Sequence, residues 1–352
     1  MRVWVDLANS PHPLIFEPVA RSLDDLGHKV VLTARDNAQT VELARSVWPE
    51  VEVVGGASPR SRAGKGATLA DRVRLLRRFA LRERPDVALS HNSYAQVAAA
   101  RTLGIPAVTA MDYEHQPANH VAFRLASLIL LPEALRGSEV VSQGASTAKT
   151  RYYDGLKEEL YLGEFTPDSG VLERLGVQRS DETAIVVART APSRAAYHRF
   201  ENTLFADVLE LLEGDDGVRC VVLPRHPDER EKLAAIGGGR LIVPEAAVDS
   251  RSLMVSADLM VGGGGTMTRE AALLGTPTLS LFGGRPAAVD RWLEERGLLR
   301  RLERAEDVLP VARRPVGEDG GIARLRARGE RLRAQLVDAA IAMASAGGRR
   351  RH

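Results

Sequence analysis

The sequence predicts an α/β fold made of two doubly wound domains with parallel sheets. Short apolar runs alternate with helical stretches along the whole chain, which is typical of parallel α/β architecture. The alternation restarts after residues 162–169, and a glycine run joins a strand to a helix in the second half. Ligands of open α/β sheets bind at the carboxyl ends of the strands, so we expect the two domains to face a central cleft.

The first half of the chain has a series of candidate strands, each a short apolar run bounded by turn residues. Helical periodicity lies between most of them, for example in Phe16–Leu26 and Thr40–Ser46. The strands are expected at Val3–Leu7, Lys29–Thr33, Val51–Val54, Val87–Ser90, Ala107–Ala110 and Leu128–Leu131.

The second half repeats this rhythm of strands and helices. Helices are expected at Phe200–Leu212 and Glu229–Ala235, where apolar residues recur at helical spacing. The strands are expected at Ala184–Ala188, Val218–Leu223, Leu241–Ile242, Leu259–Val261 and Thr278–Phe282.

Between the halves, residues 162–169 (LGEFTPDS) carry turn residues without periodicity and are interpreted as a linker. We therefore predict an N-terminal domain over residues 1–163 and a C-terminal domain over residues 164–321. A helix over 322–343 is expected to complete the first domain, and residues 344–352 to form a disordered basic tail. The apolar positions expected on that helix are Leu325, Leu332, Leu336 and Ile341.

Composition excludes several classes of protein. The chain of 352 residues has a formal net charge of only +2, which does not favour a nucleic-acid partner. Its single cysteine, Cys220, cannot form an internal disulfide and fits a reducing cytoplasm. No apolar run approaches the ~20 residues of a membrane span, and the first residues alternate like a strand. We therefore expect a cytoplasmic protein; its oligomeric state has no signal in the sequence.

Residues 60–84 depart from this neutrality, with nine basic residues against two acidic ones. Leu69, Val73, Leu76 and Ala80 form one helical face, and the arginines occupy the rest. The favoured interpretation is a solvated amphipathic helix that covers the sheet. The alternative is a surface for an anionic lipid or acceptor, which would place the protein at the inner membrane surface.

Four consecutive glycines end the apolar run Leu259–Val261 and precede a helical pattern that starts at Thr266 and ends at Gly275. A glycine loop that opens a helix lets backbone N–H groups approach an anion, and the helix dipole adds roughly half a positive charge there. One or two glycines would suit a tight turn, whereas four, each with its cost in backbone entropy, favour a phosphate site. That site comprises Gly262, Gly263, Gly264, Gly265 and Thr266.

Three more side chains in the second half are candidates for binding a nucleotide. Glu270 lies one turn into the helix, where a carboxylate can reach the hydroxyls of a ribose; Met267 three residues earlier excludes a capping box. Arg189 and His226 follow the first two strands of this half. An arginine there can neutralise a diphosphate leaving group, although a surface ion pair and a solvated loop histidine are the alternatives.

Polar side chains follow three strands of the first half. Because parallel strands end at one edge of a sheet, we expect these side chains to gather into a site for the acceptor. A general base for a hydroxyl is expected among His12, Asp112 and Glu114. The substrate-binding candidates beside them are Ser10, His91, Asn92, Ser93 and His115. No H-x-x-x-H pair and no cysteine cluster occurs, so we expect no metal.

Three segments carry a resemblance to known proteins: NSPHPLIFEPVARSL, YYDGLKEELYL and GGGGTMTREAALLGTP. The chain resembles an uncharacterised prokaryotic family, a domain of unknown function in the GT-B superfamily, related to UDP-N-acetylglucosamine 2-epimerases and MurG-like glycosyltransferases. The resemblance implies two Rossmann-like domains, with the nucleotide of a UDP-sugar held mainly by the C-terminal one. Gly264, Gly265, Thr266 and Glu270 match the phosphate and ribose contacts of such enzymes.

The resemblance is uneven in the first domain. His12 falls where MurG-like enzymes have a histidine near the reacting sugar, although Asn-Ser-Pro replaces their glycine-rich loop. Pro224-Arg225-His226 fits a Pro-x-His segment of the epimerases. Their acidic residues are missing where this chain has His91-Asn92-Ser93 and Ala118-Asn119, and only Asp112 remains, which counts against epimerisation.

The leading hypothesis is a metal-independent glycosyltransferase that needs no cofactor and binds a UDP-sugar as donor in the cleft. Its acceptor is unidentified; a lipid-linked or anionic molecule is the one that the alternative interpretation of residues 60–84 indicates. A UDP-N-acetylglucosamine 2-epimerase-like enzyme or hydrolase is one alternative. A non-catalytic nucleotide-sugar-binding protein is the other.

Overall fold

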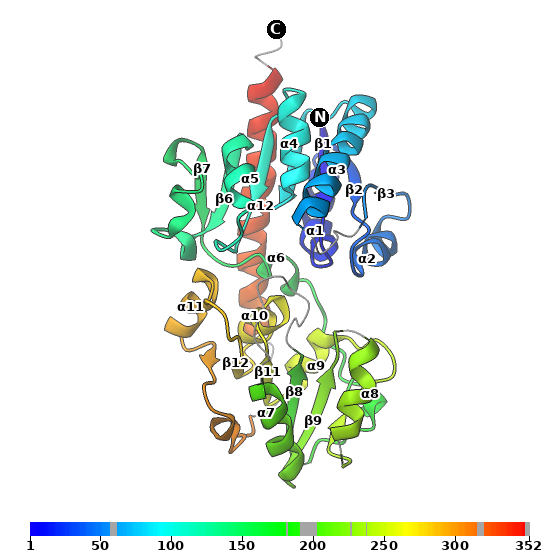
Figure 1. The fold of residues 1–352 in the computed structure, drawn as a ribbon, viewed down its shortest axis with the longest axis vertical. Coiled ribbons are helices and arrows are strands. Elements are labelled where there is room, and N and C mark those ends of the chain that lie inside the picture. Colours follow the sequence, from blue (N-terminus) through cyan, green and yellow to red (C-terminus); the bar gives the residue numbers. More distant parts are fainter. Residues whose placement is uncertain are drawn as a thin grey trace. The chain divides into compact units, whose positions relative to one another are not determined.

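The computed structural model describes residues 1–56, 62–180, 182–190, 203–225, 227–236, 238–314 and 320–348. The chain divides into two compact units. The N-unit comprises Met1–Tyr161, Ala287–Val289 and Ala327–His352, and the C-unit comprises Leu162–Pro286 and Asp290–Arg326. Each unit is built around one parallel sheet, as the sequence predicts (Figure 1).

The sheet of the N-unit has seven strands in the order β3-β2-β1-β4-β5-β6-β7. All of its pairs are parallel, and β1 lies between β2 and β4 with Val3 opposite Val30 and Val87. Every strand predicted in the first half is present. The additional strand is β7, a half-polar edge strand that lacks a continuous apolar run. The strands are β1 (Arg2–Leu7), β2 (Lys29–Ala34), β3 (Glu52–Val53), β4 (Val87–His91), β5 (Ala107–Ala110), β6 (Leu128–Pro132) and β7 (Thr150–Tyr153).

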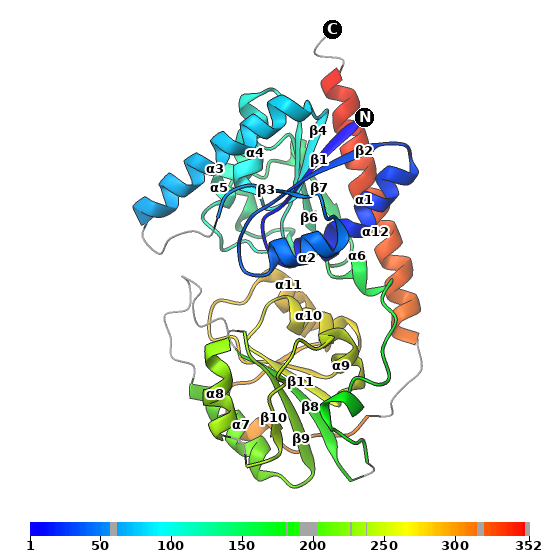
Figure 2. The same cartoon turned by 90° about the vertical axis from the view of Figure 1, so that its right-hand side faces the viewer.

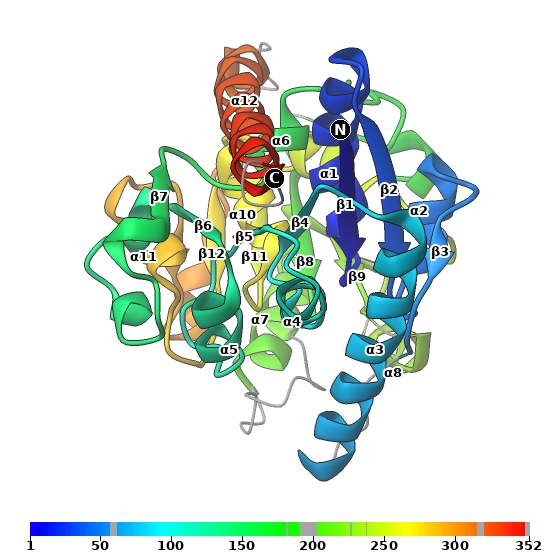
Figure 3. The same ribbon diagram turned by 90° about the horizontal axis from the view of Figure 1, so that it is seen from above.

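Helices cover both faces of this sheet. In Figures 2 and 3, α3, α4 and α5 lie along one face, while α1 and α12 lie along the other. The first of these helices, α1, begins at His12, four residues before the predicted start, because Pro13 is tolerated in a first helical turn. The helices are α1 (His12–Asp25), α2 (Thr40–Val47), α3 (Arg62–Glu83), α4 (Tyr94–Thr102), α5 (Asn119–Leu125), α6 (Glu159–Leu162) and α12 (Gly320–Gly348); Leu162 of α6 and residues 320–326 of α12 belong to the C-unit.

The C-terminal helix differs from its prediction at two points. Leu325, Leu332 and Leu336 are buried as expected, but Ile341 is half-buried. Part of the expected tail is helical, since α12 continues to Gly348 through an alanine-rich stretch with high helix propensity. The remaining tail residues, 349–352, lie outside the described residues.

The long basic helix α3 contains the clearest departure from its predicted pattern. Leu76 and Ala80 are buried as expected, and Leu69 and Val73 are half-buried. Arg72, assigned by periodicity to the solvated side, is only 4% exposed. Its guanidinium donates from Nη2 to both carboxylate oxygens of Asp6, at 2.8 and 3.0 Å. A buried arginine is tolerated only when paired, and that partner lies on a distant strand.

The sheet of the C-unit has six strands in the order β10-β9-β8-β11-β12-β13, all paired in parallel. Helices α7 and α8 lie on one face, and α9 and α10 on the other (Figure 2). The predicted strands are present, β12 ends two residues early, and the two-arginine strand β13 was not predicted. The strands are β8 (Ala184–Arg189), β9 (Val218–Leu223), β10 (Leu241–Ile242), β11 (Leu259–Gly262), β12 (Thr278–Ser280) and β13 (Arg300–Arg301).

The helices of the C-unit match the predicted rhythm. Residues 200–202, the predicted start of α7, lie outside the described residues. The helices are α7 (Thr203–Gly214), α8 (Pro227–Ile236), α9 (Ser250–Ser256), α10 (Thr266–Leu273) and α11 (Ala288–Glu295), whose first two residues belong to the N-unit.

The strand order reverses between β1 and β4 in the N-unit and between β8 and β11 in the C-unit. Crossover helices leave such a switch point on opposite faces, so the carboxyl ends of its strands open onto a crevice. In the part of the chain that the structure describes, no helix is both long and apolar enough to cross a membrane.

Candidate functional site

The glycine run forms a sharp turn between β11 and α10. Gly264 and Gly265 have φ values of 85° and 93°, in the left-handed region that favours glycine. Gly265 is the N-cap of α10, which begins at Thr266 as predicted. The N–H groups of a first helical turn have no intrahelical acceptor, so this turn can bind an anion.

Packing explains two of the four glycines without a ligand. A Cβ on Gly262 would lie 2.6 Å from Oγ1 of Thr268, and one on Gly264 would lie 3.2 Å from the Phe282 ring. The nearest atom to a Cβ on Gly265 is Nη2 of Arg225, at 3.9 Å. Among the described residues, Gly265 therefore has more room around it than Gly262 or Gly264, and an arginine lies beside it.

Arg225 is held against this loop by hydrogen bonds to the backbone. Its Nε donates to the Thr190 carbonyl at 2.8 Å, and its Nη2 donates to the Gly264 carbonyl at 3.4 Å. Its backbone N–H donates to Oε2 of Glu229 at 2.8 Å. These contacts fix a guanidinium next to the N-terminus of α10. Arg225 was not among the predicted binding residues, although it stands next to the candidate His226 in the sequence and follows a predicted strand by two residues.

The other candidates of the C-unit have different surroundings. Arg189 donates to the Leu223 and Pro224 carbonyls, at 3.3 and 2.7 Å. Burial, and then the charge of Arg225, lowers the pKa of Arg189 to about 10. His226 lies outside the described residues. Glu270 lies one turn into α10 and is only 6% exposed.

His12 is buried at the start of α1 in the N-unit. Its Nδ1 accepts a hydrogen bond from the Ala8 backbone N–H at 3.0 Å, so the neutral ring carries its proton on Nε2. Burial, followed by the charge of His91, lowers the pKa of His12 well below its usual value. The ring also makes a hydrogen bond with the Asp6 backbone. A neutral imidazole whose acceptor nitrogen is already engaged has no free lone pair for a proton, so this geometry disfavours His12 as a base.

His12 belongs to a buried cluster of titratable side chains at the carboxyl edge of the sheet. The rings of His12 and His91 lie edge to face with centroids 5.4 Å apart. His91 Nε2 lies 3.4 Å from Oδ1 of Asp112. Lys157 pairs with Asp112 and also donates to Oε1 of Glu158 at 2.7 Å. The structure thus brings together the ends of β1, β4 and β5, as the parallel topology predicts.

Lys157 and Glu158 were not among the predicted site residues. Both are buried, and they follow β7 in the segment YYDGLKEELYL. The sequence contained a signal for them, because residues 157–159 are three consecutive charges inside an apolar segment. A solvated loop would not need apolar residues on both sides of its charges. The third, Glu159, pairs with Arg328 of α12, and burial raises its pKa.

Glu114, His115 and Ser10 lie in other networks. Oε1 of Glu114 accepts from the Ala288 backbone N–H at 2.8 Å and lies 3.5 Å from Nε2 of His115. Nδ1 of His115 lies 2.8 Å from Oε1 of Glu139. The Ser10 hydroxyl accepts from the Gln39 backbone N–H at 3.3 Å. The Glu114 carboxylate thus holds a backbone amide, which disfavours it as a base.

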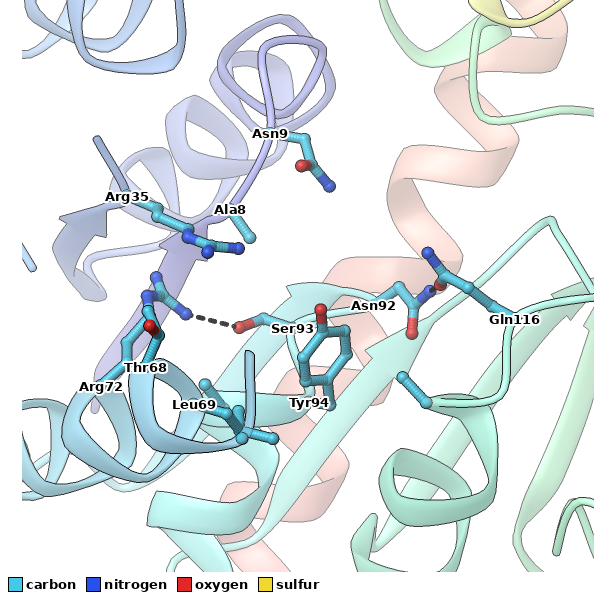
Figure 4. A pocket seen from close by; sticks show the side chains of 13 residues that line it. Ala8, Asn9, Arg35, Thr68, Leu69, Arg72, Asn92, Ser93, Tyr94 and Gln116 are labelled. Carbon is cyan, nitrogen blue, oxygen red and sulfur yellow. Dashed lines mark hydrogen bonds between the residues drawn. The ribbon is translucent and has the colours of Figure 1, made fainter. Parts of the chain in front are cut away.

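Asn92 and Ser93 line a pocket of about 420 Å³ at the β1/β4 switch point. Arg35 and Arg72 lie on one side of this pocket, and Asn92 and Gln116 lie on the other (Figure 4). Within the described ranges, no group of three or more histidine, cysteine, aspartate or glutamate side chains is arranged to hold a metal ion.

Solved structures with this architecture include epimerases and a glycosyltransferase. One is the UDP-GlcNAc 2-epimerase of Methanocaldococcus jannaschii in complex with UDP-GlcNAc and UDP. It is 13% identical with a TM-score of 0.67, and the match covers 92% of this chain and 98% of that one. Another is the glycotransferase of kitacinnamycin, which is 15% identical with a TM-score of 0.62 over 97% of this chain and 98% of that one. At these identities the likeness shows the fold alone, which confirms the predicted GT-B architecture.

A relative by sequence is an uncharacterized protein of Methanocaldococcus jannaschii. It is 26% identical over 329 residues, which are 92% of this chain and 94% of that protein. The model of the family described as "Protein of unknown function (DUF354)" matches residues 1–338. The chain therefore belongs to the DUF354 family, as the resemblance in its sequence implied.

Proposed function

We propose that this protein is a nucleotide-sugar-dependent glycosyltransferase whose C-unit binds a UDP-sugar. The observation that carries the proposal is the placement of Arg225 beside Gly265 at the N-terminus of α10. The helix dipole and the guanidinium both favour negative charge at this point. A diphosphate carries negative charge and several acceptor oxygens, so it can interact with the helix N-terminus and with the guanidinium at the same time. Neighbours in fold whose complexes contain UDP and UDP-GlcNAc support this choice.

Charge stabilisation at the same place suits the chemistry of transfer. When an acceptor oxygen attacks the anomeric carbon, the bond from that carbon to the diphosphate oxygen breaks and negative charge grows on the diphosphate. Groups already positioned at that charge lower the barrier, because they need no reorganisation during the reaction. Arg225 and the α10 amides take this role, and Glu270 binds the ribose hydroxyls. Arg189, tied to strand-end carbonyls, holds the loop that carries Arg225.

The acceptor proton needs a base, and the N-unit cluster supplies one. Asp112 lies against His91, and the two form a dyad that takes the proton of the attacking hydroxyl. His12 packs against His91 as a neutral ring and keeps that imidazole in place. Lys157 places a positive charge against Asp112 and keeps its carboxylate in place. No step in this scheme uses a metal or another cofactor.

Calorimetric titration with UDP tests the donor site. Arg225→Met should lower UDP affinity by roughly tenfold or more, since a hydrogen bond to a charged group contributes about 1.5–3 kcal/mol. Glu270→Ala should weaken UDP binding and leave binding of inorganic pyrophosphate unchanged. Arg296→Met is the matched control, because Arg296 is exposed over the Trp292 ring in the same unit. Absence of saturable UDP binding to the wild type would refute the proposal.

The buried carboxylates also suit a second candidate, a UDP-N-acetylglucosamine 2-epimerase. Asp112 and Glu158 are both buried in the N-unit, and removal of a sugar C–H proton needs such a group. Incubation with UDP-N-acetylglucosamine alone in D₂O distinguishes the two reactions. Deuterium at the sugar C2 favours epimerisation. Transfer to an added acceptor without deuterium favours the glycosyltransferase, and binding with neither outcome leaves a non-catalytic nucleotide-sugar protein.

Contact of α3 with an anionic lipid surface stays a prediction. Arg74, Arg77 and Arg78 are exposed there, and Leu81 is 59% exposed. Cosedimentation with phosphatidylglycerol vesicles at low and high salt tests it, because surface electrostatics are screened by salt. Binding that is equal at both salt concentrations would contradict an electrostatic contact.

A further inference from the structure

The edge strand β13 consists of two arginines, which no apolar pattern explains. It pairs in parallel with β12, with Arg300 opposite Leu279 and Arg301 opposite Ser280, and it is the last strand of the C-unit sheet. Arg300 is exposed, whereas Arg301 is half-buried. An arginine that gives up part of its hydration needs acceptors in the protein, so the contacts of Arg301 indicate its role.

Arg301 holds the loop that follows β12. Its Nη2 donates to the carbonyl oxygen of Phe282 at 2.8 Å and to that of Gly284 at 2.9 Å. Both carbonyls lie beyond the last residue of β12, where the ladder of the sheet no longer supplies donors. A charged donor makes stronger hydrogen bonds than a neutral one, so Arg301 fixes the backbone of residues 282–284.

The side chain of Phe282 extends this restraint to the glycine turn between β11 and α10. Phe282 is half-buried, and two glycines lie close to it. A Cβ on Gly264 would lie 3.2 Å from Cδ2 of Phe282 and 3.3 Å from its Cβ and Cγ. A Cβ on Gly284 would lie 2.8 Å from Cζ of the same ring. The ring therefore contacts the turn on one side and its own loop on the other.

The turn and this loop leave the sheet at neighbouring points. Gly262 ends β11 opposite Ser280, which ends β12, and the Leu281 N–H donates to the Gly262 carbonyl at 2.8 Å. In the turn, Gly264 and Gly265 have left-handed φ values, and a glycine backbone has more conformations to choose from than any other. A run of glycines keeps one conformation only where packing restrains it, and the aromatic ring supplies such packing.

We propose that Arg301 is a positioning residue, which acts through Phe282 to keep the glycine turn in its anion-binding conformation. When only a fraction of the molecules has the binding conformation, the apparent affinity falls by that fraction. Arg301 raises this fraction before any ligand arrives. The consequence for UDP affinity rests on the proposed function, whereas the effect on the turn does not.

Hydrogen exchange of the unliganded protein, followed by mass spectrometry, tests the effect on the turn. Arg301→Met removes both hydrogen bonds and keeps an apolar stem, so we expect peptides that cover residues 262–268 and 281–285 to exchange about tenfold faster. Arg301→Lys should bring exchange back toward the wild type, because its ammonium can donate to the same carbonyls. Arg300→Met is the matched control, since Arg300 donates from the same strand to the Asp307 carbonyl.

Calorimetric titration with UDP and with inorganic pyrophosphate tests the effect on binding. Arg301→Met should weaken both ligands by the same factor, about threefold to tenfold, because both need the ordered turn. Glu270→Ala differs, since it should weaken UDP alone. Phe282→Leu should reproduce the effect of Arg301→Met, because leucine lacks the flat ring beside Gly264. It also decides the question if Arg301→Met does not fold.

Three results would overturn the inference. One is unchanged exchange of residues 262–268 in Arg301→Met and Phe282→Leu. Another is equal acceleration in Arg300→Met, which would mean that β13 as a whole has loosened. The third is faster exchange with wild-type affinity for both ligands. If the wild type binds no UDP, the proposed function fails, and the exchange data alone decide whether Arg301 orders the turn.

Discussion

The burial of a neutral His12 leads to a quantitative prediction about how the free energy of unfolding changes with pH. The pKa of His12 in the folded protein is well below its usual 6.5, with burial as the largest cause and the charge of His91 next. On acidification, His12 therefore binds a proton in the unfolded chain at a pH at which it is still neutral in the folded chain. The stability associated with His12 is fully present above about pH 6.5 and is lost as pH falls below it.

The magnitude follows from the linkage between pKa and folding. Below the unfolded pKa, each pH unit costs up to about 1.4 kcal/mol until the folded pKa is reached. Between pH 7.5 and pH 5.5, His12 alone should therefore remove about 1.4 kcal/mol from the free energy of unfolding of the N-unit. His12→Asn abolishes this contribution, because an asparagine Oδ1 can accept from the Ala8 N–H and does not titrate.

Urea unfolding at the two pH values measures the effect. A Trp292→Phe background leaves Trp4 and Trp48 as fluorescent reporters, and both belong to the N-unit. The comparison uses the change with pH within each protein, so any cavity left by the smaller asparagine cancels. All other titratable groups are shared by the two proteins.

The expected result is a larger loss of stability on acidification in the wild type than in His12→Asn, by about 1.4 kcal/mol. Equal losses in the two proteins would mean that His12 titrates alike in the folded and unfolded states. A smaller loss in the wild type would mean that folding favours the imidazolium. Either outcome would refute the assignment of His12 as a neutral side chain in the folded protein.

Three further predictions concern single positions. Arg72→Met should lower the free energy of unfolding of the N-unit by about 3–5 kcal/mol in urea unfolding, because it leaves the Asp6 carboxylate buried without its cation. A second substitution in the same chain, Asp6→Asn, should restore part of that free energy. Gly264→Ala should lower the melting temperature through about 1–2 kcal/mol of left-handed backbone strain and a close contact with Phe282; an unchanged value would show that the loop relaxes freely. Cys220 should resist Ellman's reagent in the native protein and react in urea, since burial raises the pKa of its thiol; rapid native labelling would contradict its burial.

The sequence was sufficient for most of the architecture because both sheets are parallel and buried on both faces. Their strands are then continuous apolar runs, which is why Ala107–Ala110 and Val218–Leu223 were predicted to the residue. Thr150–Tyr153 and Arg300–Arg301 were missed because edge strands are short and polar, and only a neighbouring strand makes them extended.

The sequence predicted which loops form the candidate site, but not which side chains contact one another there. Parallel topology alone places the ends of three strands at one edge of the sheet, and His12, His91 and Asp112 do lie together there. The same rule cannot select between neighbours in a loop. Arg189 ends a strand and Arg225 follows one by two residues, but only the path of the backbone decides which guanidinium lies beside Gly265.

By itself, the sequence determined the fold class, the parallel pairing of the strands and the glycine turn, since these follow from periodicity and backbone conformation over a few residues. Tertiary structure alone decided that Arg72 is buried against Asp6, that Lys157 lies against Asp112, and that Nδ1 of His12 accepts from the Ala8 N–H. The physical reason is that these features depend on contacts between residues far apart in the sequence. Burial of a charge, and the tautomer of a histidine, depend on atoms brought close by folding from distant parts of the chain, and no local pattern encodes them.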